Sequence, residues 1–317
     1  MRLLGWIIGA FMALTAPSLA AWPERPITAI VPFAAGGGTD GVARILADHL
    51  GRNLGQAVVI ENRGGANGFI ASEAVARARP DGYTFLSTAN TTHGSNPALF
   101  HRLPYDPVAD FAPVALIGVG VLLVVVNNDL PVRSMRELAD YARANPGKLN
   151  FASGSASSRV AGEMFKAMAG VDMVNVTYRS NPLGITDVIG GVAQVMFVDA
   201  TTSMPQAREG RVRAIGVTSR QRVSMMPDVP TVEEQGFPGY EMLSWNAMYA
   251  PAGTPPEIVA RVNGLVNDIM ARPAVRERLT ASGMVLRPGS PEDLARFQAS
   301  EIEKWKRLVR ESGIELQ

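Results

Sequence analysis

Segments typical of strands and of helices alternate along this chain, and the same order occurs twice. A β-branched run at Ile27–Val31 precedes a glycine-rich loop, and residues 42–50 place their apolar side chains on one helical face. Residues 149–152, the small-residue loop 153–158 and residues 160–169 repeat this order. Such alternation is typical of parallel strands joined by helical crossovers. The sequence therefore predicts an α/β fold with two doubly wound lobes joined by a hinge.

The rest of the chain fits the same architecture, with a helical end. From Pro255 onward the apolar spacing indicates helices, ending in an amphipathic helix at 294–309 that we expect to pack back on the first lobe. The predicted division is therefore lobe 1 at 21–124 and 231–317, and lobe 2 at 125–230. The other expected strands are 57–60, 83–87, 115–126, 174–178 and 194–198, and the other expected helices are 69–78, 135–144 and a segment around 186–189.

The first twenty residues have the features of a cleaved export signal. Met1 and Arg2 form a positive start, residues 3–16 are nearly all apolar, and Ser18-Leu19-Ala20 places small residues where a signal peptidase cuts. The apolar run is shorter than the ~20 residues that span a bilayer. No cysteine follows it, which excludes a lipid anchor. We expect cleavage after Ala20 and a periplasmic location.

Charge and cysteine content exclude several classes of protein. Arg2 is the only charged residue of the predicted signal, so the 30 basic and 29 acidic residues become 29 of each in the mature chain. A net charge of zero gives no electrostatic basis for binding nucleic acid or an acidic membrane surface. The chain has no cysteine. Its core must therefore be held by packing alone, which a large domain can achieve.

The first glycine-rich loop has two interpretations. Residues 36–41 read Gly-Gly-Gly-Thr-Asp-Gly, a literal G-x-G-x-x-G between a strand and a helix, and Glu61 follows twenty residues after Gly41. This is the pattern of a dinucleotide site and gives the alternative of an exported NAD-dependent oxidoreductase. Residues 32–35 separate the strand from the first glycine, however, where that pattern requires an immediate turn. Export also removes the protein from the cytoplasmic supply of nicotinamide cofactor.

The same loop also suits an anion. Glycines allow backbone N–H groups to face a ligand, and the start of a helix carries a partial positive charge. Thr39 and Asp40 are good N-cap residues, so simple capping is the structural interpretation of this segment. The loop 153–158 offers a second donor-rich helix start. Two such starts facing a cleft predict a carboxylate site that needs no lysine or arginine, although Arg179 is near enough in sequence to add charge.

Nothing in the sequence favours catalysis. His49, His93 and His101 do not have the spacing of zinc ligands, and neither a G-x-S-x-G motif nor a thiol is present. The serine-rich loop at 153–158 resembles that of a hydrolase only in composition, since no base accompanies it. We therefore expect a binding protein with no catalytic residues, no metal and no cofactor.

Short sequence motifs typical of one protein family occur along almost the whole mature chain, in the same order as in that family. The chain resembles the periplasmic Bug proteins, the receptors of tripartite tricarboxylate transporters. The resemblance lies in VPFAAGGGTD at 31–40, VVIENRGGA at 58–66, PDGY at 80–83, LPYDP at 103–107, PGKLNFAS at 146–153, AGE at 161–163, PDVPT at 227–231 and APAGTP at 250–255.

The resemblance implies a type II periplasmic binding fold that closes around a small carboxylate, such as a dicarboxylate or an acidic amino acid. It also implies delivery to a membrane transporter complex, although a sensor is equally compatible with the sequence. The ligand would be held by loop amides, hydroxyls and ordered water. By motif, the implied ligand-binding residues are Phe33, Ala34, Gly38, Thr39, Asn90, Ser153, Ser155, Ala156, Ser157 and Asp199.

Four positions leave alternatives open. Asp199 either contacts an ammonium or hydroxyl group of the ligand or only orders its loop, because a bare carboxylate repels an anion. Arg179 is expected in a salt bridge at the rim rather than on the ligand. Trp245 is either an apolar wall or ordinary core. Residues 180–182 read Ser-Asn-Pro, where the family usually has glycine first and proline later, so the usual ligand cannot be assumed.

Overall fold

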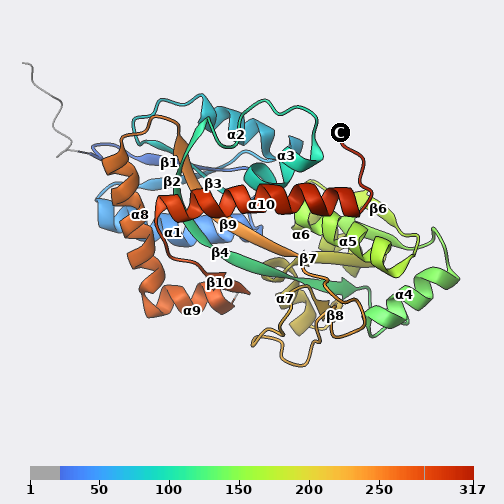
Figure 1. Ribbon diagram of the computed structural model, residues 1–317. Helices are drawn as coiled ribbons and strands as arrows, with labels where there is room; N and C mark the ends of the chain where they lie inside the picture. Colours follow the sequence, from blue (N-terminus) through green and yellow to red (C-terminus); the bar gives the residue numbers. More distant parts are fainter. Residues whose placement is uncertain (1–21, 282) are drawn as a thin grey trace, which may run out of the picture.

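The computed structural model describes residues 22–281 and 283–317. The predicted signal segment and its cut after Ala20 lie outside these residues. Within them, ten strands form one curled sheet in the order β2-β1-β3-β9-β4-β7-β5-β6, and β8 and β10 also pair with β4. Figure 1 shows helices packed around both ends of this sheet.

Two groups of parallel strands form the ends of the sheet. In the first group, β1 (Ile27–Val31) lies between β2 (Val58–Asn62) and β3 (Thr84–Ala89). In the second, β5 (Asn150–Ser153) lies between β6 (Val174–Thr177) and β7 (Val195–Asp199), again in parallel. These are the strands that the alternating pattern predicts, and their boundaries agree with the sequence to within about two residues.

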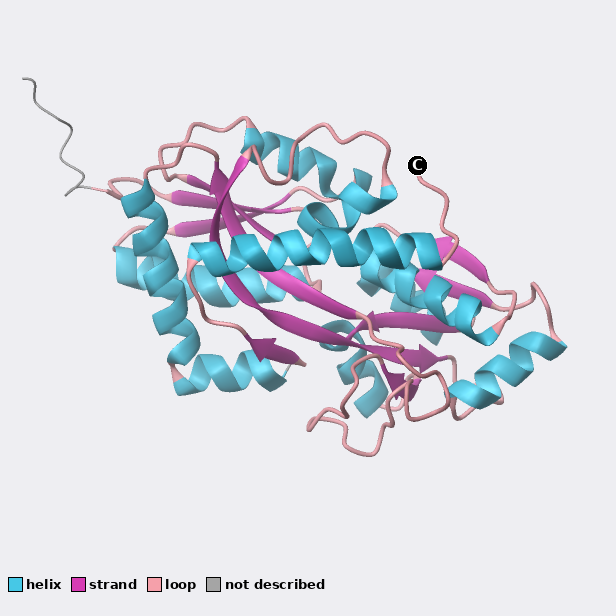
Figure 2. Ribbon diagram, in the orientation of Figure 1, coloured by secondary structure: helices cyan, strands magenta, loops and turns pink. Residues whose placement is uncertain are grey.

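Two long antiparallel strands join the groups, which corrects the expectation of a mainly parallel sheet. β4 (Phe111–Val126) pairs with β9 (Leu243–Pro251) as far as Val121, and from Leu122 onward it pairs with β7. Figure 2 shows the two strands running through the middle of the molecule. We call β1–β3, β9, β10 and residues 111–121 the first half-sheet, and β5–β8 with residues 122–126 the second half-sheet.

Three strands were missed by the sequence patterns, and all of them pair at long range. β9 pairs with β3 and β4, β8 (Arg213–Val217) pairs with β4, and β10 (Met284–Leu286) interrupts the region expected to be wholly helical. β10 is three residues long and is held by hydrogen bonds to residues 118–120 of β4. Strands of this kind form because they pair with distant segments, so the local periodicity of the sequence does not identify them.

Helices cover both faces of each half-sheet. On the first, α1 (Gly38–Leu54), α8 (Pro256–Ala271) and α9 (Pro273–Ala281) pack on one face and α2 (Phe69–Ala76) on the other. On the second, α4 (Met135–Ala144) and α5 (Ala156–Ala169) lie opposite α6 (Asn181–Ile189) and α7 (Ala200–Arg208). Short helical turns, η2 (Ala66–Gly68), η3 (Thr91–Ser95) and α3 (Asn96–Leu99), complete the loops.

The C-terminal helix α10 (Pro291–Glu311) contacts both half-sheets. It starts with a capping box in which the side chains of Ser290 and Asp293 bind each other's backbone N–H. Leu294, in its first turn, packs with the α2 side of the first half-sheet, whereas Trp305 packs in the cluster that contains α4 and α5. Figure 1 shows α10, in red, lying along the molecule from one half to the other. The sequence predicted only its contact with the first lobe.

A buried tryptophan fixes β9 against α10. Trp245 is 1% exposed, its ring packs edge-on to Phe297 at 5.6 Å, and its Nε1 donates a hydrogen bond to Glu301 Oε2 at 3.1 Å. Of the two alternatives for Trp245, the structure therefore supports a core residue. Within the described part of the chain, no helix combines the length and apolar content that crossing a bilayer requires.

Candidate functional site

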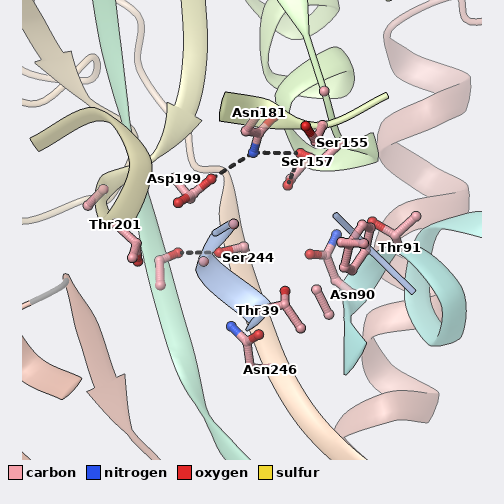
Figure 3. Close-up of a pocket in the computed structure, with 18 of the residues that line it drawn as sticks. Thr39, Asn90, Thr91, Ser155, Ser157, Asn181, Asp199, Thr201, Ser244 and Asn246 are labelled. Atoms are coloured by element: carbon pink, nitrogen blue, oxygen red, sulfur yellow. Dashed lines mark hydrogen bonds between the residues drawn. The ribbon is translucent and has the colours of Figure 1, made fainter. Parts of the chain in front are cut away.

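The loops that follow β1, β3, β5 and β7 converge on one cleft of about 700 Å³, which we call the central pocket. It lies where β4 passes from one half-sheet to the other, at Gly120 and Val121. Figure 3 shows polar side chains from both half-sheets pointing into it. The lining residues are Phe33, Ala34, Gly37, Gly38, Thr39, Ala89, Asn90, Thr91, Gly120, Val121, Gly154, Ser155, Ser157, Ser180, Asn181, Pro182, Asp199, Ala200, Thr201, Ser244, Asn246 and Met284.

The start of α1 faces this pocket without a side-chain cap. Its N-cap residue is Gly37, which has no side chain to accept a hydrogen bond from the first turn. Asp40, considered above as a capping residue, instead accepts hydrogen bonds from the Gly36 N–H and from Arg44 Nε, both at 2.9 Å. The backbone N–H groups at the start of α1 therefore stay available at a helix end that favours anions.

Asp40 also holds the loop in place. It is buried, and Asn62 Nδ2 donates to it at 2.9 Å. Burial opposes ionisation of Asp40, but its hydrogen bonds with Arg44, Gly36 and Asn62 outweigh burial and keep the pKa of this carboxyl below its ordinary value. Gly36 adopts a φ of +83°, which explains a glycine at this turn.

The start of α5 enters the pocket from the second half-sheet. Ser155 is its N-cap, with its Oγ accepting from the Ser158 N–H at 3.3 Å and lying 3.2 Å from Ser157 Oγ. Gly154 is required here, because a Cβ would lie 2.2 Å from the carbonyl carbon of Ser180. This close contact aligns the loop after β5 with the loop after β6.

Asp199 has a structural role that the structure shows directly. It is the N-cap of α7, where Oδ1 accepts hydrogen bonds from Thr202 N–H and Oγ1, both at 2.9 Å. Its Oδ2 accepts a hydrogen bond from Asn181 Nδ2 at 2.6 Å. Asp199 also lines the pocket, and a Cβ on Gly38 would lie 3.0 Å from its Oδ1. The carboxylate therefore closely approaches the start of α1.

Four residues that line the pocket each have a buried polar atom without a hydrogen-bond partner. Within the described residues none of these atoms is satisfied: Asn90 Nδ2, Thr91 Oγ1, Asn181 Oδ1 and Asn246 Oδ1. Buried polar groups normally have partners, so these four mark a place for polar atoms of another molecule or water. Among the described residues that line the pocket, Asp199 is the only one with a charged side chain.

Most of the residues predicted to bind ligand meet in this pocket. Phe33, Ala34, Gly38, Thr39, Asn90, Ser155, Ser157 and Asp199 line it. Ser153 and Ala156 do not; they line a neighbouring cavity, and Ser153 Oγ donates to Asn175 Oδ1 at 2.7 Å. Arg179 also lines that cavity and is exposed, but it forms no ion pair within the described residues, so the expected rim salt bridge is absent from that part of the chain.

Several polar residues that line the pocket were not predicted from the sequence. Ser244 and Asn246 come from β9, and they share one strand face while Trp245 points to the other. The alternation of polar and apolar residues in Ser-Trp-Asn was the sequence signal that could have identified them. Thr91 directly follows the predicted residue Asn90, and Thr201 lies two residues after the predicted residue Asp199. Asn181 lies in the atypical segment 180–182, the one that differs from the usual family pattern.

The geometry does not support a dinucleotide site. Glu61 lines neither the central pocket nor the neighbouring cavity, and it instead binds Arg63, whose Nε lies 2.7 Å from its Oε1. The hydrogen bond with Arg63 lowers the pKa of Glu61. An acidic residue that recognises ribose should lie at the ligand cleft. Nor do the described residues contain a histidine and carboxylate cluster able to hold a metal ion.

Comparisons with known proteins give a consistent assignment. The family model described as the tripartite tricarboxylate transporter family receptor matches residues 42–314. Protein BugT of Bordetella pertussis is 35% identical over 322 residues, covering 99% of this chain and 98% of that protein.

Two solved structures extend the comparison to the fold. Rpa4515 of R. palustris, solved with adipate, has a TM-score of 0.91 at 34% identity. The match covers 93% of this chain and 100% of the Rpa4515 chain. MatC of Rhodopseudomonas palustris, solved with bound malate, has a TM-score of 0.86 at 35% identity, with 91% and 100% covered. The predicted fold class is confirmed, and neither comparison supports the oxidoreductase alternative. The chain belongs to the tripartite tricarboxylate transporter receptor family, whose fold is that of periplasmic solute-binding proteins.

Proposed function

We propose that this protein is a periplasmic receptor that captures a small carboxylate in the central pocket. The observation that carries the proposal is the meeting of two helix starts, α1 and α5, at a pocket lined by unpartnered amide and hydroxyl groups. Helix starts stabilise negative charge through their free N–H groups. No basic side chain of the described residues lines the pocket, so the backbone and neutral side chains would hold the ligand carboxylate.

The expected affinity is compatible with this set of contacts. A micromolar Kd corresponds to about 8 kcal/mol. Hydrogen bonds to a charged group contribute about 1.5–3 kcal/mol each, so several of them exceed the cost of association when the pocket closes over the ligand. The solved relatives Rpa4515 and MatC contain adipate and malate, and both are dicarboxylates. We infer a ligand of the same chemical class.

The predicted lobes give this proposal a mechanism. Lobe 1 (21–124 and 231–317) would carry the start of α1, and lobe 2 (125–230) the start of α5. Closure about connections near Val125 and Thr231 would bring the two starts together on the ligand. We further propose that cleavage after Ala20 releases the receptor into the periplasm and that the loaded form docks on a membrane transporter complex of its family or on a sensor.

A ligand screen tests the proposal. The mature protein is incubated with mono-, di- and tricarboxylates, acidic amino acids and NAD, and the thermal midpoint is measured for each. We expect stabilisation by at least one carboxylate and none by NAD, with a Kd from titration calorimetry that fits one site. Stabilisation by NAD and by no carboxylate would contradict the proposal.

A further inference from the structure

A second cavity of about 990 Å³, which we call the arginine cavity, adjoins the central pocket. The two share Phe33, Thr91, Gly154 and Ser155 in their linings, so they lie next to each other along these residues. The loops after β1, β5 and β6 form most of its wall, and other lining residues are Gly65, Asn67, Gly68 and the C-terminal Gln317.

The charged side chains that line the arginine cavity are both basic. They belong to Arg159 and Arg179, and among the described residues no aspartate or glutamate lines the cavity. The C-terminal residue Gln317, which carries the main-chain carboxylate, also lines it. Most arginines that form ion pairs in this protein do so at exposed positions, but within residues 22–281 and 283–317 neither Arg159 nor Arg179 forms an ion pair with a carboxylate.

Arg159 is the more deeply placed of the two. Its side chain is partly buried, and its Nε is fully covered without a hydrogen-bond acceptor. Burying part of a guanidinium without a partner is unfavourable, which makes an anion at this position stabilising. Arg179 is exposed and lies at the same cavity, after β6.

The position of Arg159 on α5 links it to the proposed carboxylate site. Its backbone N–H donates to the carbonyl of Ser155 at 3.0 Å, so it lies one helical turn beyond the residue that faces both cavities. One end of a ligand held at the start of α5 thus has a guanidinium one turn away for its other end. Phe33 lines both cavities and offers apolar surface to a chain between the two ends.

We infer that the arginine cavity is a second anion subsite, in which Arg159, assisted by Arg179, binds the distal carboxylate of a dicarboxylate whose other end occupies the central pocket. The inference rests on the proposed function, because it assigns the second end of the same ligand. It selects dianions over monocarboxylates of equal length. It also gives the two sites different roles. The neutral donors of the central pocket hold one carboxylate, and the arginines select ligands that carry a second one.

The test compares matched acids in wild type and in Arg159→Gln. Titration calorimetry measures Kd for a series of straight-chain diacids from malonate to suberate and for the monocarboxylate of equal carbon number in each case. Arg179→Gln is the second variant, and Arg307→Gln, an exposed arginine on α10 that lines neither cavity, is the matched control. Thermal unfolding of each variant checks that it is folded.

The inference predicts that wild type prefers a diacid to its matched monoacid. Arg159→Gln should weaken diacid binding by about 10- to 100-fold, as expected for the loss of charge-assisted hydrogen bonds, and should change monoacid binding by less than about twofold. Arg179→Gln should act in the same direction but less strongly, because that side chain is exposed. Arg307→Gln should leave both affinities unchanged.

Two results would overturn the inference, and they differ in what they imply. If wild type binds monoacids as tightly as diacids, or if Arg159→Gln weakens both equally, the second subsite does not exist although the carboxylate receptor remains. If wild type binds no carboxylate at all, the proposed function is wrong and the subsite is excluded with it. Should Arg159→Gln fail to fold, the ratio of diacid to monoacid affinity in Arg179→Gln decides, since an unchanged ratio there refutes the inference.

Discussion

At the scale of single residues, the central pocket depends on how closely the two half-sheets approach. Gly38 and Asp199 come from opposite sides and nearly touch, and Asp199 in turn caps α7 and accepts a hydrogen bond from Asn181. Because Asp199 already accepts hydrogen bonds from Asn181 and Thr202, its carboxylate does not require an ammonium group of the ligand. We therefore favour the loop-ordering role for Asp199, which leaves the anion to the backbone amides and neutral side chains.

Gly38→Ala should weaken ligand binding by at least about tenfold with little effect on folding, because a new Cβ would lie 3.0 Å from Asp199 Oδ1 and hold the two sides apart. Gly41→Ala is the matched control, since no atom lies within 4 Å of its added Cβ. That control should raise the free energy of unfolding by about 0.5–1 kcal/mol. Calorimetric Kd values and urea unfolding measure both effects. Equal affinities for the two variants would contradict the close approach.

Asp199→Asn and Asp199→Ala separate capping from ligand contact. The asparagine keeps an acceptor for the Thr202 N–H, so it should nearly preserve stability, whereas the alanine should cost about 1 kcal/mol of unfolding free energy. Removing the negative charge should also strengthen binding of a simple dicarboxylate by a few fold, because like-charge repulsion disappears. Urea unfolding and titration calorimetry provide the two readouts. A large loss of affinity in Asp199→Asn would instead assign Asp199 to the ligand.

At the scale of elements, the sequence predicted those parts of the site that depend on local order. The loops after β1 and β5 combine a strand, small residues and a helix within about twenty residues, so their pattern is visible in one stretch of sequence. β9 is different, because its residues form a strand only by pairing with β3 and β4. Ser244 and Asn246 were missed for that reason, whereas Ser153, predicted to bind ligand, lines the neighbouring cavity and donates its hydroxyl hydrogen to Asn175.

The short helical turn η3 contains a buried histidine that should make stability depend on pH. Burial lowers the pKa of His93 to about 3, and its ring stacks on Tyr249 with centroids 4.0 Å apart. The unfolded chain takes up a proton near pH 6.5 while the folded protein stays neutral down to its lower pKa. The stabilising contribution is therefore complete above pH 6.5 and decreases by about 1.4 kcal/mol per pH unit below it, until pH approaches the folded value.

Between pH 6.5 and pH 5, wild type should thus lose about 2 kcal/mol of unfolding free energy through His93. His93→Gln should remove most of this decrease, whatever its effect on stability at neutral pH. His101→Gln is the control, since His101 is exposed, and it should retain the wild-type slope. Urea unfolding at several pH values gives the slopes. A wild-type slope in His93→Gln would show that the buried imidazole does not control the acid response.

At the scale of the whole molecule, β4 and α10 contribute to both halves. β4 pairs with β9 in the first half-sheet and with β7 and β8 in the second, and α10 contributes Leu294 to one core cluster and Trp305 to another. A receptor that closes about a hinge needs lobes that move as bodies, yet these connections pass through both cores. Closure would then bend β4 between the crossing at residues 121–122, next to the central pocket, and the proposed connection near Val125.

The shared elements also predict that the protein unfolds as one unit rather than lobe by lobe. Differential scanning calorimetry should give a single transition, with equal calorimetric and van't Hoff enthalpies. Trp305→Ala removes a fully buried ring from α10 and should lower the unfolding free energy by about 3–5 kcal/mol while keeping one transition. Leu316→Ala, at an exposed residue, should change it by less than about 0.5 kcal/mol.

A saturating dicarboxylate should shift the whole transition upward, because a ligand that binds only the folded state stabilises everything that unfolds with its site. Two separate transitions, of which the ligand moves only one, would mean that α10 and the crossing strands do not couple the halves.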